Sequence, residues 1–336
     1  MGLAICGAAG AQGKLEQIQV MGESLRGNLE GDDPNRTVYV YLPPGYGNTG
    51  KRYPVVYFLH GYAADAKFYV DTIGLPQAAD KAIAAGAHEV IVVIPDAYTL
   101  YNGSMYSNSP TTGDWESYVA RDLVAWIDKH YRTIARRDGR GLAGHSMGGY
   151  GTMRIAMRFP EVFRAIYAMS ACCLMNQAPD KAAVEAQIAA ARNPSPPTPP
   201  PRVSDGPLQG PPPGFAKVLP AQAAAWAPNP DNPPLYFDWP FVNGEPQPLV
   251  QGKWIANSPL IMVDQHVPAL KSFSAIMIDV GDKDGLAATN KQLDEALTRL
   301  HVQHGFEVYA GDHTNRVPQR FTESVLPFFS RELKTR

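Results

Sequence analysis

The stretch Gly141–Gly149 combines a serine with closely spaced glycines. Ser146 stands between Gly144 and Gly148 in a Gly-x-Ser-x-Gly pattern, after small and apolar residues and before a run of helical periodicity. A sharp strand-to-helix turn leaves no room for Cβ atoms on either side of its apex, which explains both glycines. The N-terminus of the following helix favours negative charge beside the serine. Ser146 is therefore the predicted nucleophile, and the alternative is an exposed serine in a glycine-rich turn.

His313 is the predicted general base. A serine hydroxyl is a poor nucleophile near neutral pH, so it needs a base, and the base needs an acid that fixes its tautomer. After a serine on such a turn the acid comes next in the chain and the histidine last, and His313 follows the last predicted strand. Two other histidines are expected in other roles. His60 should order the loop that follows its own strand, and His145 should face away from Ser146.

Two aspartates compete for the role of triad acid. Asp282 and Asp284 both follow a strand that ends at Val280. We select Asp284, because Asp282 lies closer to the strand end and can serve the turn. Asp312 is a weaker candidate, since it adjoins His313 and should point away from it. The same segment is similar to part of a calcium loop, but Val280 occupies the position of the first ligand, so we predict no metal there.

The oxyanion of a tetrahedral intermediate needs two preorganised N–H donors. Met147, directly after the nucleophile, should supply one of them. The second should come from the loop after the strand 53–59, where Tyr62 follows His60 and Gly61. Because the backbone supplies both donors, the side chains at these two positions can vary.

Strands and helices alternate around these residues. This order predicts a doubly wound, mostly parallel sheet whose strand C-termini meet along one rim, where ligands bind. The expected strands are 36–42, 53–59, 90–94, 163–170, 274–280 and 306–309, and the expected helices are 75–86, 115–131, 286–302 and 317–334.

The domain organisation is predicted to be a single α/β domain over 14–336 with an insertion at about 179–254. Of the 31 prolines, 19 lie between 179 and 248, which excludes long regular helices or central strands there. A short alanine-rich helix (181–192) and a low-complexity linker (193–213) are expected first. The aromatic stretch 215–254 is expected to form a cap or lid over a pocket.

The composition excludes several classes of function. The 336 residues have a hydrophobic share of 45% and a formal net charge of −2, so they can form a core but lack the basic surplus of a nucleic-acid-binding protein. No apolar run is long enough to span a bilayer. Adjacent Cys172 and Cys173 are expected as buried thiols. Residues 1–13 resemble the end of a signal peptide, which favours a secreted or periplasmic protein over a cytoplasmic one.

Together these residues make the chain resemble the esterase D-like branch of the α/β-hydrolase superfamily, which includes feruloyl esterases, acetyl xylan esterases and S-formylglutathione hydrolases. The resemblance implies an α/β-hydrolase fold and catalysis without a metal or organic cofactor. It also implies that Ser146, Asp284 and His313 form the triad and that Tyr62 and Met147 hold the oxyanion. The motifs that carry it are Tyr53–Gly61, Asp114–Tyr118, Gly141–Gly151, Phe159–Phe163, Gly281–Asp284 and His313.

The expected function is hydrolysis of carboxylic esters through an acyl-enzyme, on feruloyl, aryl or short-chain acyl esters that are small molecules or linked to polysaccharide. Trp115 could line an aromatic acyl pocket, and a place in the packed core is the alternative. Two other functions stay open. One is acyl transfer by the same triad, and the other is a non-catalytic binding protein that uses the proline-rich segment.

Overall fold

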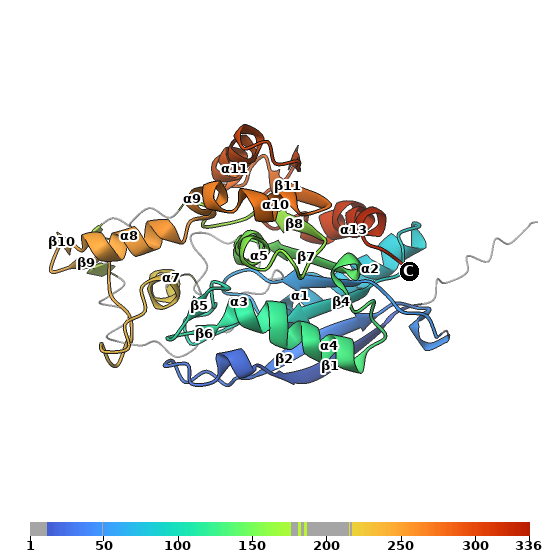
Figure 1. Ribbon diagram of the computed structural model, residues 1–336, viewed down its shortest axis with the longest axis horizontal. Coiled ribbons are helices and arrows are strands. Elements are labelled where there is room, and N and C mark those ends of the chain that lie inside the picture. The colour runs from blue at the N-terminus through green and yellow to red at the C-terminus, as the bar shows by residue number, and fades with distance from the viewer. Residues whose placement is uncertain (1–11, 49, 176–180, 183–184, 187–214, 216) are drawn as a thin grey trace, which may run out of the picture.

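The computed structural model describes residues 12–48, 50–175, 181–182, 185–186, 215 and 217–336. Its main sheet comprises β1 (Lys14–Met21), β2 (Asn35–Leu42), β3 (Val55–Leu59), β4 (Ile91–Pro95), β7 (Arg140–His145), β8 (Ala165–Met169), β11 (Ala275–Gly281) and β12 (Gly305–Tyr309). The eight strands are ordered β1-β2-β4-β3-β7-β8-β11-β12. β2 is antiparallel to both β1 and β4, and all pairs from β4 to β12 are parallel. The predicted mostly parallel α/β-hydrolase sheet is therefore confirmed (Figure 1).

Helices cover both faces of this sheet (Figure 1). The α-helices are α1 (Ala66–Asp71), α2 (Leu75–Ala84), α3 (Trp115–Ser117), α4 (Val124–His130), α5 (Met147–Arg158), α7 (Val218–Trp226), α8 (Pro248–Ala256), α9 (Pro259–Met262), α10 (Val267–Lys271), α11 (Ala287–Arg299), α12 (Val317–Arg320) and α13 (Leu326–Glu332). The π-helical turns are η3 (Tyr118–Leu123) and η8 (Phe321–Val325). The 3₁₀ turns are η1 (Glu23–Leu25), η2 (Tyr46–Asn48), η4 (Arg137–Gly139) and η7 (Val263–Gln265), and the short strands are β5 (Asn108–Ser109), β6 (Gly113–Asp114), β9 (Phe241–Val242) and β10 (Glu245–Pro246).

The core lies on both sides of the sheet, because successive strand residues point to opposite faces. In β3, Tyr57 and Leu59 join a cluster with residues of α4, α5 and α11. Val56 and Phe58 of the same strand join a second cluster with residues of α1, α2, η8 and α13. All five β3 residues are buried, as expected of a parallel strand covered on both faces.

The expected helix 115–131 forms as one helical run with a π-helical turn in its middle. η3 connects α3 to α4 without a break in the chain. A π-turn holds more residues than an α-turn, because its hydrogen bonds join residues five apart. The apolar spacing of this helix predicts one buried stripe of Val119, Leu123, Trp126, Ile127 and Tyr131. Val119, Leu123 and Ile127 are fully buried, whereas Trp126 and Tyr131 are only partly buried. The closing helix contains a similar turn, η8, between α12 and α13.

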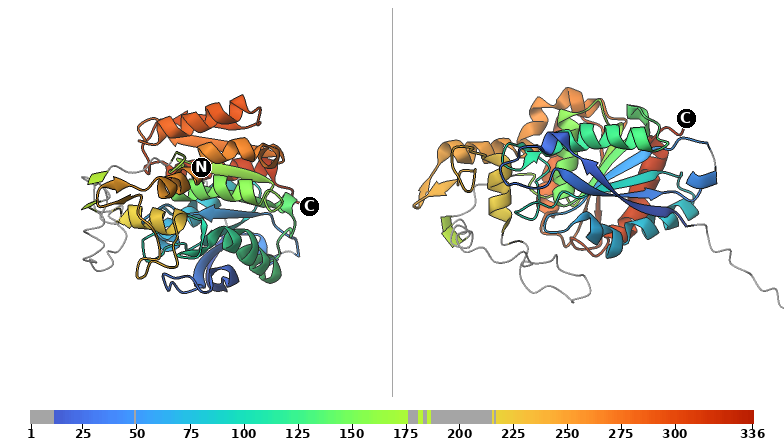
Figure 2. Two further views of the ribbon diagram at one scale, coloured as in Figure 1. Left: turned by 60° about the vertical axis from the view of Figure 1, so that its left-hand side comes forward. Right: turned by 90° about the horizontal axis from the view of Figure 1, so that it is seen from below.

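The aromatic part of the insertion packs onto the main domain. Trp226, Phe237 and Trp254 are buried and belong to the same core cluster as α5. α7, α8 and the β9–β10 hairpin lie together at one end of the sheet (Figure 1 and Figure 2). Hydrogen bonds anchor them there: Ser109 Oγ donates to the carbonyl of Ala224 at 2.6 Å, and the Tyr150 hydroxyl donates to the carbonyl of a residue just after α8, Asn257, at 3.0 Å.

Several predicted segments lie wholly or mostly outside the described residues. The linker at 193–213 lies outside the described residues, as do most of the signal-peptide remnant at 1–13 and of the alanine-rich helix at 181–192. Within the described residues, no helix has the length and apolar character required to cross a membrane.

Candidate active site

Ser146 stands at the turn between β7 and α5, with a backbone conformation that is uncommon for a residue with a side chain. Its φ is 59° and its ψ is −114°. The flanking glycines make this turn possible. A Cβ on Gly144 would lie 2.3 Å from the carbonyl oxygen of Gly148, and a Cβ on Gly148 would lie 2.0 Å from that of Leu59. The turn therefore packs directly against the end of β3, with Ser146 only 8% exposed.

A chain of two hydrogen bonds runs from Asp284 to Ser146. Oδ2 of Asp284 lies 2.8 Å from Nδ1 of His313, and Nε2 of His313 lies 2.9 Å from Oγ of Ser146. Asp284 follows β11 and His313 follows β12, which are neighbouring parallel strands, so both loops emerge on the rim where Ser146 stands. The His313 side chain is 32% exposed and that of Asp284 2%, so the acid is shielded and the base is open to solvent.

Hydrogen bonds keep Asp284 ionised. Burial by itself raises the pKa of this carboxyl, but the hydrogen bond and charge of His313 and the backbone N–H of Leu286 oppose it, and the net pKa is below the usual value. The Leu286 N–H lies 2.9 Å from Oδ1, so each carboxylate oxygen has a donor. An ionised carboxylate at Nδ1 keeps a proton on that nitrogen and leaves Nε2 free to accept from the serine.

The two competing aspartates bind backbone groups instead. Asp282 accepts the N–H of Gly311 at 2.9 Å, which holds the two loops together. Asp312 accepts the N–H groups of Thr314 and Asn315 through one oxygen. Of the three, the structure brings only Asp284 within hydrogen-bonding distance of the His313 ring.

The loop after β3 lies against the nucleophile. A Cβ on Gly61 would lie 3.4 Å from Cβ of Ser146. A Cβ on Gly103 would approach both the Tyr62 ring, at 2.7 Å, and the Met147 sulfur, at 2.8 Å, so these two side chains meet around Gly103. Among the described residues, neither the Tyr62 N–H nor the Met147 N–H has a hydrogen-bond acceptor. Their role as oxyanion donors stays a prediction.

His60 fixes the backbone of this loop, as expected. Its Nε2 accepts the N–H of Ala97 at 2.8 Å, so the proton is on Nδ1, which lies 2.9 Å from the carbonyl oxygen of Gly61. Complete burial lowers the pKa of His60, and the ring stays neutral near neutral pH. Its role is thus to hold the loop.

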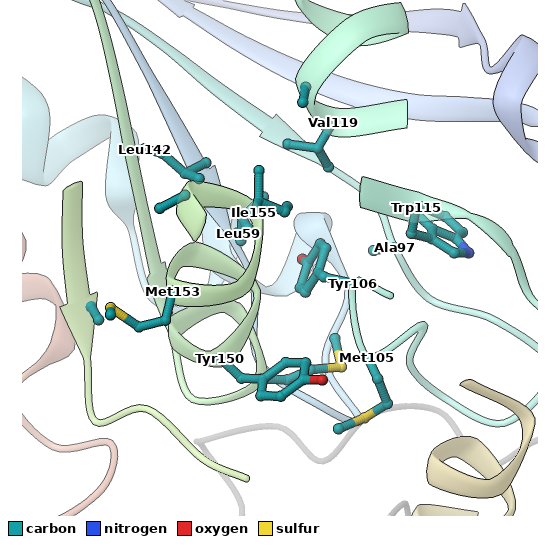
Figure 3. Close-up of a cluster of buried hydrophobic side chains, with 14 of the residues drawn as sticks. Leu59, Ala97, Met105, Tyr106, Trp115, Val119, Leu142, Tyr150, Met153 and Ile155 are labelled. Atoms are coloured by element: carbon teal, nitrogen blue, oxygen red, sulfur yellow. The ribbon is translucent and has the colours of Figure 1, made fainter. Parts of the chain in front are cut away.

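Trp115 lies in the core, which was the alternative to a pocket-lining role. Its side chain is 1% exposed, and its indole N–H donates to the carbonyl of Thr112 at 2.8 Å. Figure 3 shows it among the buried side chains near Ala97 and Val119. A ring covered on all sides has no face left for an acyl group, so the pocket-lining expectation for Trp115 does not hold.

Residues of the insertion reach the loop that carries Tyr62. The ring of Phe215 packs edge-on against the Tyr62 ring, with 5.3 Å between centroids. Nε2 of Gln222 in α7 lies 3.7 Å from the sulfur of Cys173. Cys172 and Cys173 are free and half-buried rather than fully buried, and the N–H of Cys172 donates to the Ser146 carbonyl at 3.1 Å. Phe215 and α7 therefore contact Tyr62 and Cys173, and the role of this segment as a cap stays a prediction.

Two further contacts near the site were not foreseen. His145 faces Tyr69 and the backbone of His313 rather than Ser146; the turn away from Ser146 was expected, but the contact with His313 was not. Tyr69 of α1 lies eight residues after Gly61 and binds its N–H. Neither residue stands in a pattern that indicates these partners, since they come together only through the fold. Within the described residues, no group of three or more His, Cys, Asp or Glu side chains could hold a metal ion.

A family model described as "Putative esterase" matches residues 33–324 of the chain. The chain therefore belongs to this esterase family, and its predicted place among esterases is confirmed. This assignment supports the predicted class of enzyme, a carboxylic ester hydrolase.

Curated relatives match the chain over part of its length. Esterase MT1326 of Mycobacterium tuberculosis (strain CDC 1551 / Oshkosh) is 35% identical over 130 residues, which are 37% of this chain and 26% of that protein. An endo-1,4-beta-xylanase/feruloyl esterase of Xylanibacter ruminicola is 32% identical over 157 residues, which are 45% of this chain and 20% of that protein. The chain thus spans about a quarter or less of the length of these relatives.

Solved structures share the fold over nearly the whole chain. A ferulic acid esterase superposes with a TM-score of 0.65 at 23% identity, covering 96% of this chain and 99% of that one. An S-formylglutathione hydrolase from Agrobacterium tumefaciens superposes with a TM-score of 0.62 at 18% identity, covering 96% and 97%. Both comparisons show that the chain has the same fold as these two proteins.

Proposed function

We propose that the chain is a serine esterase that cleaves carboxylic esters through Ser146, His313 and Asp284. The observation that carries this proposal is the hydrogen-bond chain of 2.8 Å and 2.9 Å that joins the three side chains. It is the arrangement in which a histidine can take a proton from a serine while a carboxylate stabilises the resulting imidazolium.

In the first half-reaction, Oγ of Ser146 attacks the ester carbonyl carbon while Nε2 of His313 takes the hydroxyl proton. The carbonyl oxygen becomes an oxyanion and is stabilised by the N–H groups of Met147 and Tyr62. The carbon–oxygen bond to the alcohol then breaks, and His313 returns its proton to the departing alkoxide. The products are a free alcohol and an acyl ester on Ser146.

In the second half-reaction, water attacks the acyl-enzyme. His313 takes a proton from the water, the oxyanion forms again, and the bond between the acyl carbon and Oγ breaks as Ser146 regains its proton. The 32% exposure of the His313 side chain lets water reach the base.

The proposed substrates are feruloyl, other aryl or short-chain acyl esters, free or attached to polysaccharide. The name of the Xylanibacter ruminicola relative, which includes feruloyl esterase, supports an aromatic acyl group. The contact of Phe215 with Tyr62 supports it as well, because it puts aromatic side chains beside the proposed oxyanion loop. Aromatic rings pack well against a planar acyl chain.

The test is hydrolysis of p-nitrophenyl esters from acetate to decanoate and of methyl ferulate, by the wild type and Ser146→Ala. Ser272→Ala, at an exposed serine before β11 and so at the opposite end of that strand from Asp284, is the matched control. We expect turnover in the wild type and the control and none above background in Ser146→Ala. A fluorophosphonate probe should label the first two proteins and not the third. Turnover that survives in Ser146→Ala contradicts the proposal, and acyl transfer to an added alcohol in preference to water would replace hydrolysis with transfer.

A further inference from the structure

A second chain of buried hydrogen bonds lies behind the proposed triad. Nδ1 of His145 lies 2.7 Å from the Tyr69 hydroxyl, and Nε2 of His145 lies 2.7 Å from the carbonyl oxygen of His313. The Tyr69 hydroxyl also accepts the N–H of Gly61 at 3.0 Å. Both side chains are 3% exposed. The chain thus connects the loop after β3 with the backbone of the proposed base.

The direction of each hydrogen bond follows from the donors available. The Tyr69 oxygen already accepts from Gly61, so its own proton can be donated to Nδ1 of His145. Nδ1 is then an acceptor, and the single proton of a neutral imidazole is on Nε2, where it is donated to the His313 carbonyl. The opposite tautomer would put the Nε2 lone pair against the carbonyl oxygen at 2.7 Å and leave the tyrosine proton unused. The arrangement therefore defines one tautomer of His145.

His145 stays neutral beside the proposed base. Burial first, and then the proximity of His313, lower the pKa of His145 to about 3, despite the opposing effect of Asp284. The two rings are close, with centroids 4.7 Å apart and planes inclined by 38°. Because His145 carries no charge, it does not oppose the positive charge that His313 acquires when it takes the serine proton.

The segment that carries His313 has few other buried anchors. It follows the edge strand β12, where Val308 is 53% exposed, and its residues 312–316 are exposed or half-buried. A catalytic group on such a loop needs support from rigid neighbours, because small displacements reduce the rate strongly. His145, at the end of the central strand β7, provides a buried donor to the main chain of His313 itself.

We propose that His145 and Tyr69 are positioning residues, which hold the main chain of His313 in register with the loop that carries Tyr62. This inference rests on the proposed ester hydrolysis for its effect on rate. Neither residue reacts with substrate. They act by keeping the base and the oxyanion donors at a constant separation while Ser146 is acylated and deacylated.

Two near-isosteric variants of His145 separate its two bonds. In His145→Gln the side-chain amide reaches the position of Nε2 and can still donate to the His313 carbonyl. In His145→Asn the amide oxygen reaches the position of Nδ1 and can accept from Tyr69, but the bond to His313 is lost. We expect His145→Gln to keep kcat within about tenfold of the wild type, and His145→Asn and His145→Leu to lower kcat by up to about 100-fold, with KM little changed.

Tyr69→Phe completes the test, because it removes the hydroxyl that accepts the N–H of Gly61. We expect it to lower kcat, and we expect the double variant Tyr69→Phe/His145→Leu to be no slower than His145→Leu, since both lie on one chain of bonds. The proposal is overturned if Asn, Gln and Leu at 145 all keep the wild-type kcat, or if all three lower kcat equally and in proportion to a fall in Tm. The latter result would assign the residue a merely structural role.

A measurement without substrate distinguishes failure of this inference from failure of the proposed function. NMR of the wild type labelled with ¹⁵N-histidine should show His145 as the Nε2–H tautomer, without titration between about pH 5 and pH 8. A protonated Nδ1, or titration in this range, overturns the inference even if esters are hydrolysed. If no ester is hydrolysed, the proposed function fails, and the tautomer and its loss in Tyr69→Phe still decide whether the hydrogen-bond chain exists.

Discussion

Asp284 and His313 are 29 residues apart in the chain, and Oδ2 of the aspartate lies 2.8 Å from Nδ1 of the histidine. They meet because β11 and β12 are adjacent parallel strands whose following loops share one rim of the sheet. Asp282, only two residues before Asp284, binds the N–H of Gly311 in the same pair of loops. Asp282 therefore joins the two loops, and Asp284 binds the proposed base.

This division predicts different results for the same substitution at the two aspartates. Asp284→Asn should lower kcat/KM for p-nitrophenyl acetate by about 10³- to 10⁴-fold, because an amide neither favours the required tautomer of His313 nor stabilises its charge. Asp282→Asn should stay within about tenfold of the wild type, since the amide oxygen can still accept from Gly311. Steady-state kinetics of both purified variants measure this, and equal losses would contradict the assignment of the acid.

The lowered pKa of Asp284 predicts a loss of stability in acid. Its folded-state pKa is below the usual value of about 3.9, so around that pH the unfolded chain binds more protons than the folded one. The stabilising contribution is complete above this value and is lost as the pH falls through the folded-state pKa. The difference in free energy of unfolding between the wild type and Asp284→Asn should therefore shrink below about pH 4. Urea unfolding over a pH series measures it, and a constant difference would show that the carboxylate is not stabilised by folding.

The packing of Gly148 predicts that even one methyl group disrupts the turn. A Cβ there would lie 2.0 Å from the carbonyl of Leu59, so Gly148→Ala should cost about 1–3 kcal/mol of unfolding free energy and most of the activity. Gly252 of α8 is the matched control, because nothing lies within 4 Å of its Cβ position. Gly252→Ala should raise the unfolding free energy by about 0.5–1 kcal/mol and leave turnover unchanged. An active Gly148→Ala variant of wild-type stability would refute the predicted steric conflict.

The contact between Phe215 and Tyr62 predicts a role in choosing the acyl group. Phe215→Ala should raise KM for methyl ferulate by roughly 3- to 10-fold, the value of one aromatic contact, and change KM for p-nitrophenyl acetate less. Leu249→Ala in the same insertion is the control, because that side chain is 77% exposed. An equal effect of Phe215→Ala on both esters would mean that the ring supports the loop and does not select the acyl group.

Local patterns in the sequence were sufficient to predict most helices and strands and the turn that carries Ser146. The spacing of apolar residues, with a period of two in strands and about 3.6 in helices, indicates which faces of these elements are buried. The parallel strands and most helices could therefore be predicted. The turn could be predicted because the conflict that excludes side chains at 144 and 148 arises between residues close in the chain or at the neighbouring strand end. The order of nucleophile, acid and histidine along the chain limited the candidates for the acid and the base to two short loops.

The tertiary structure decided what depends on contacts between distant segments. It directed Asp284 rather than Asp282 to His313, buried Trp115, and placed a π-helical turn in the helix at 115–131. It also brought Tyr69, His145 and the His313 backbone into one chain of hydrogen bonds. No sequence period encodes such contacts, because they depend on which strands become neighbours and on how the loops beyond their ends are packed.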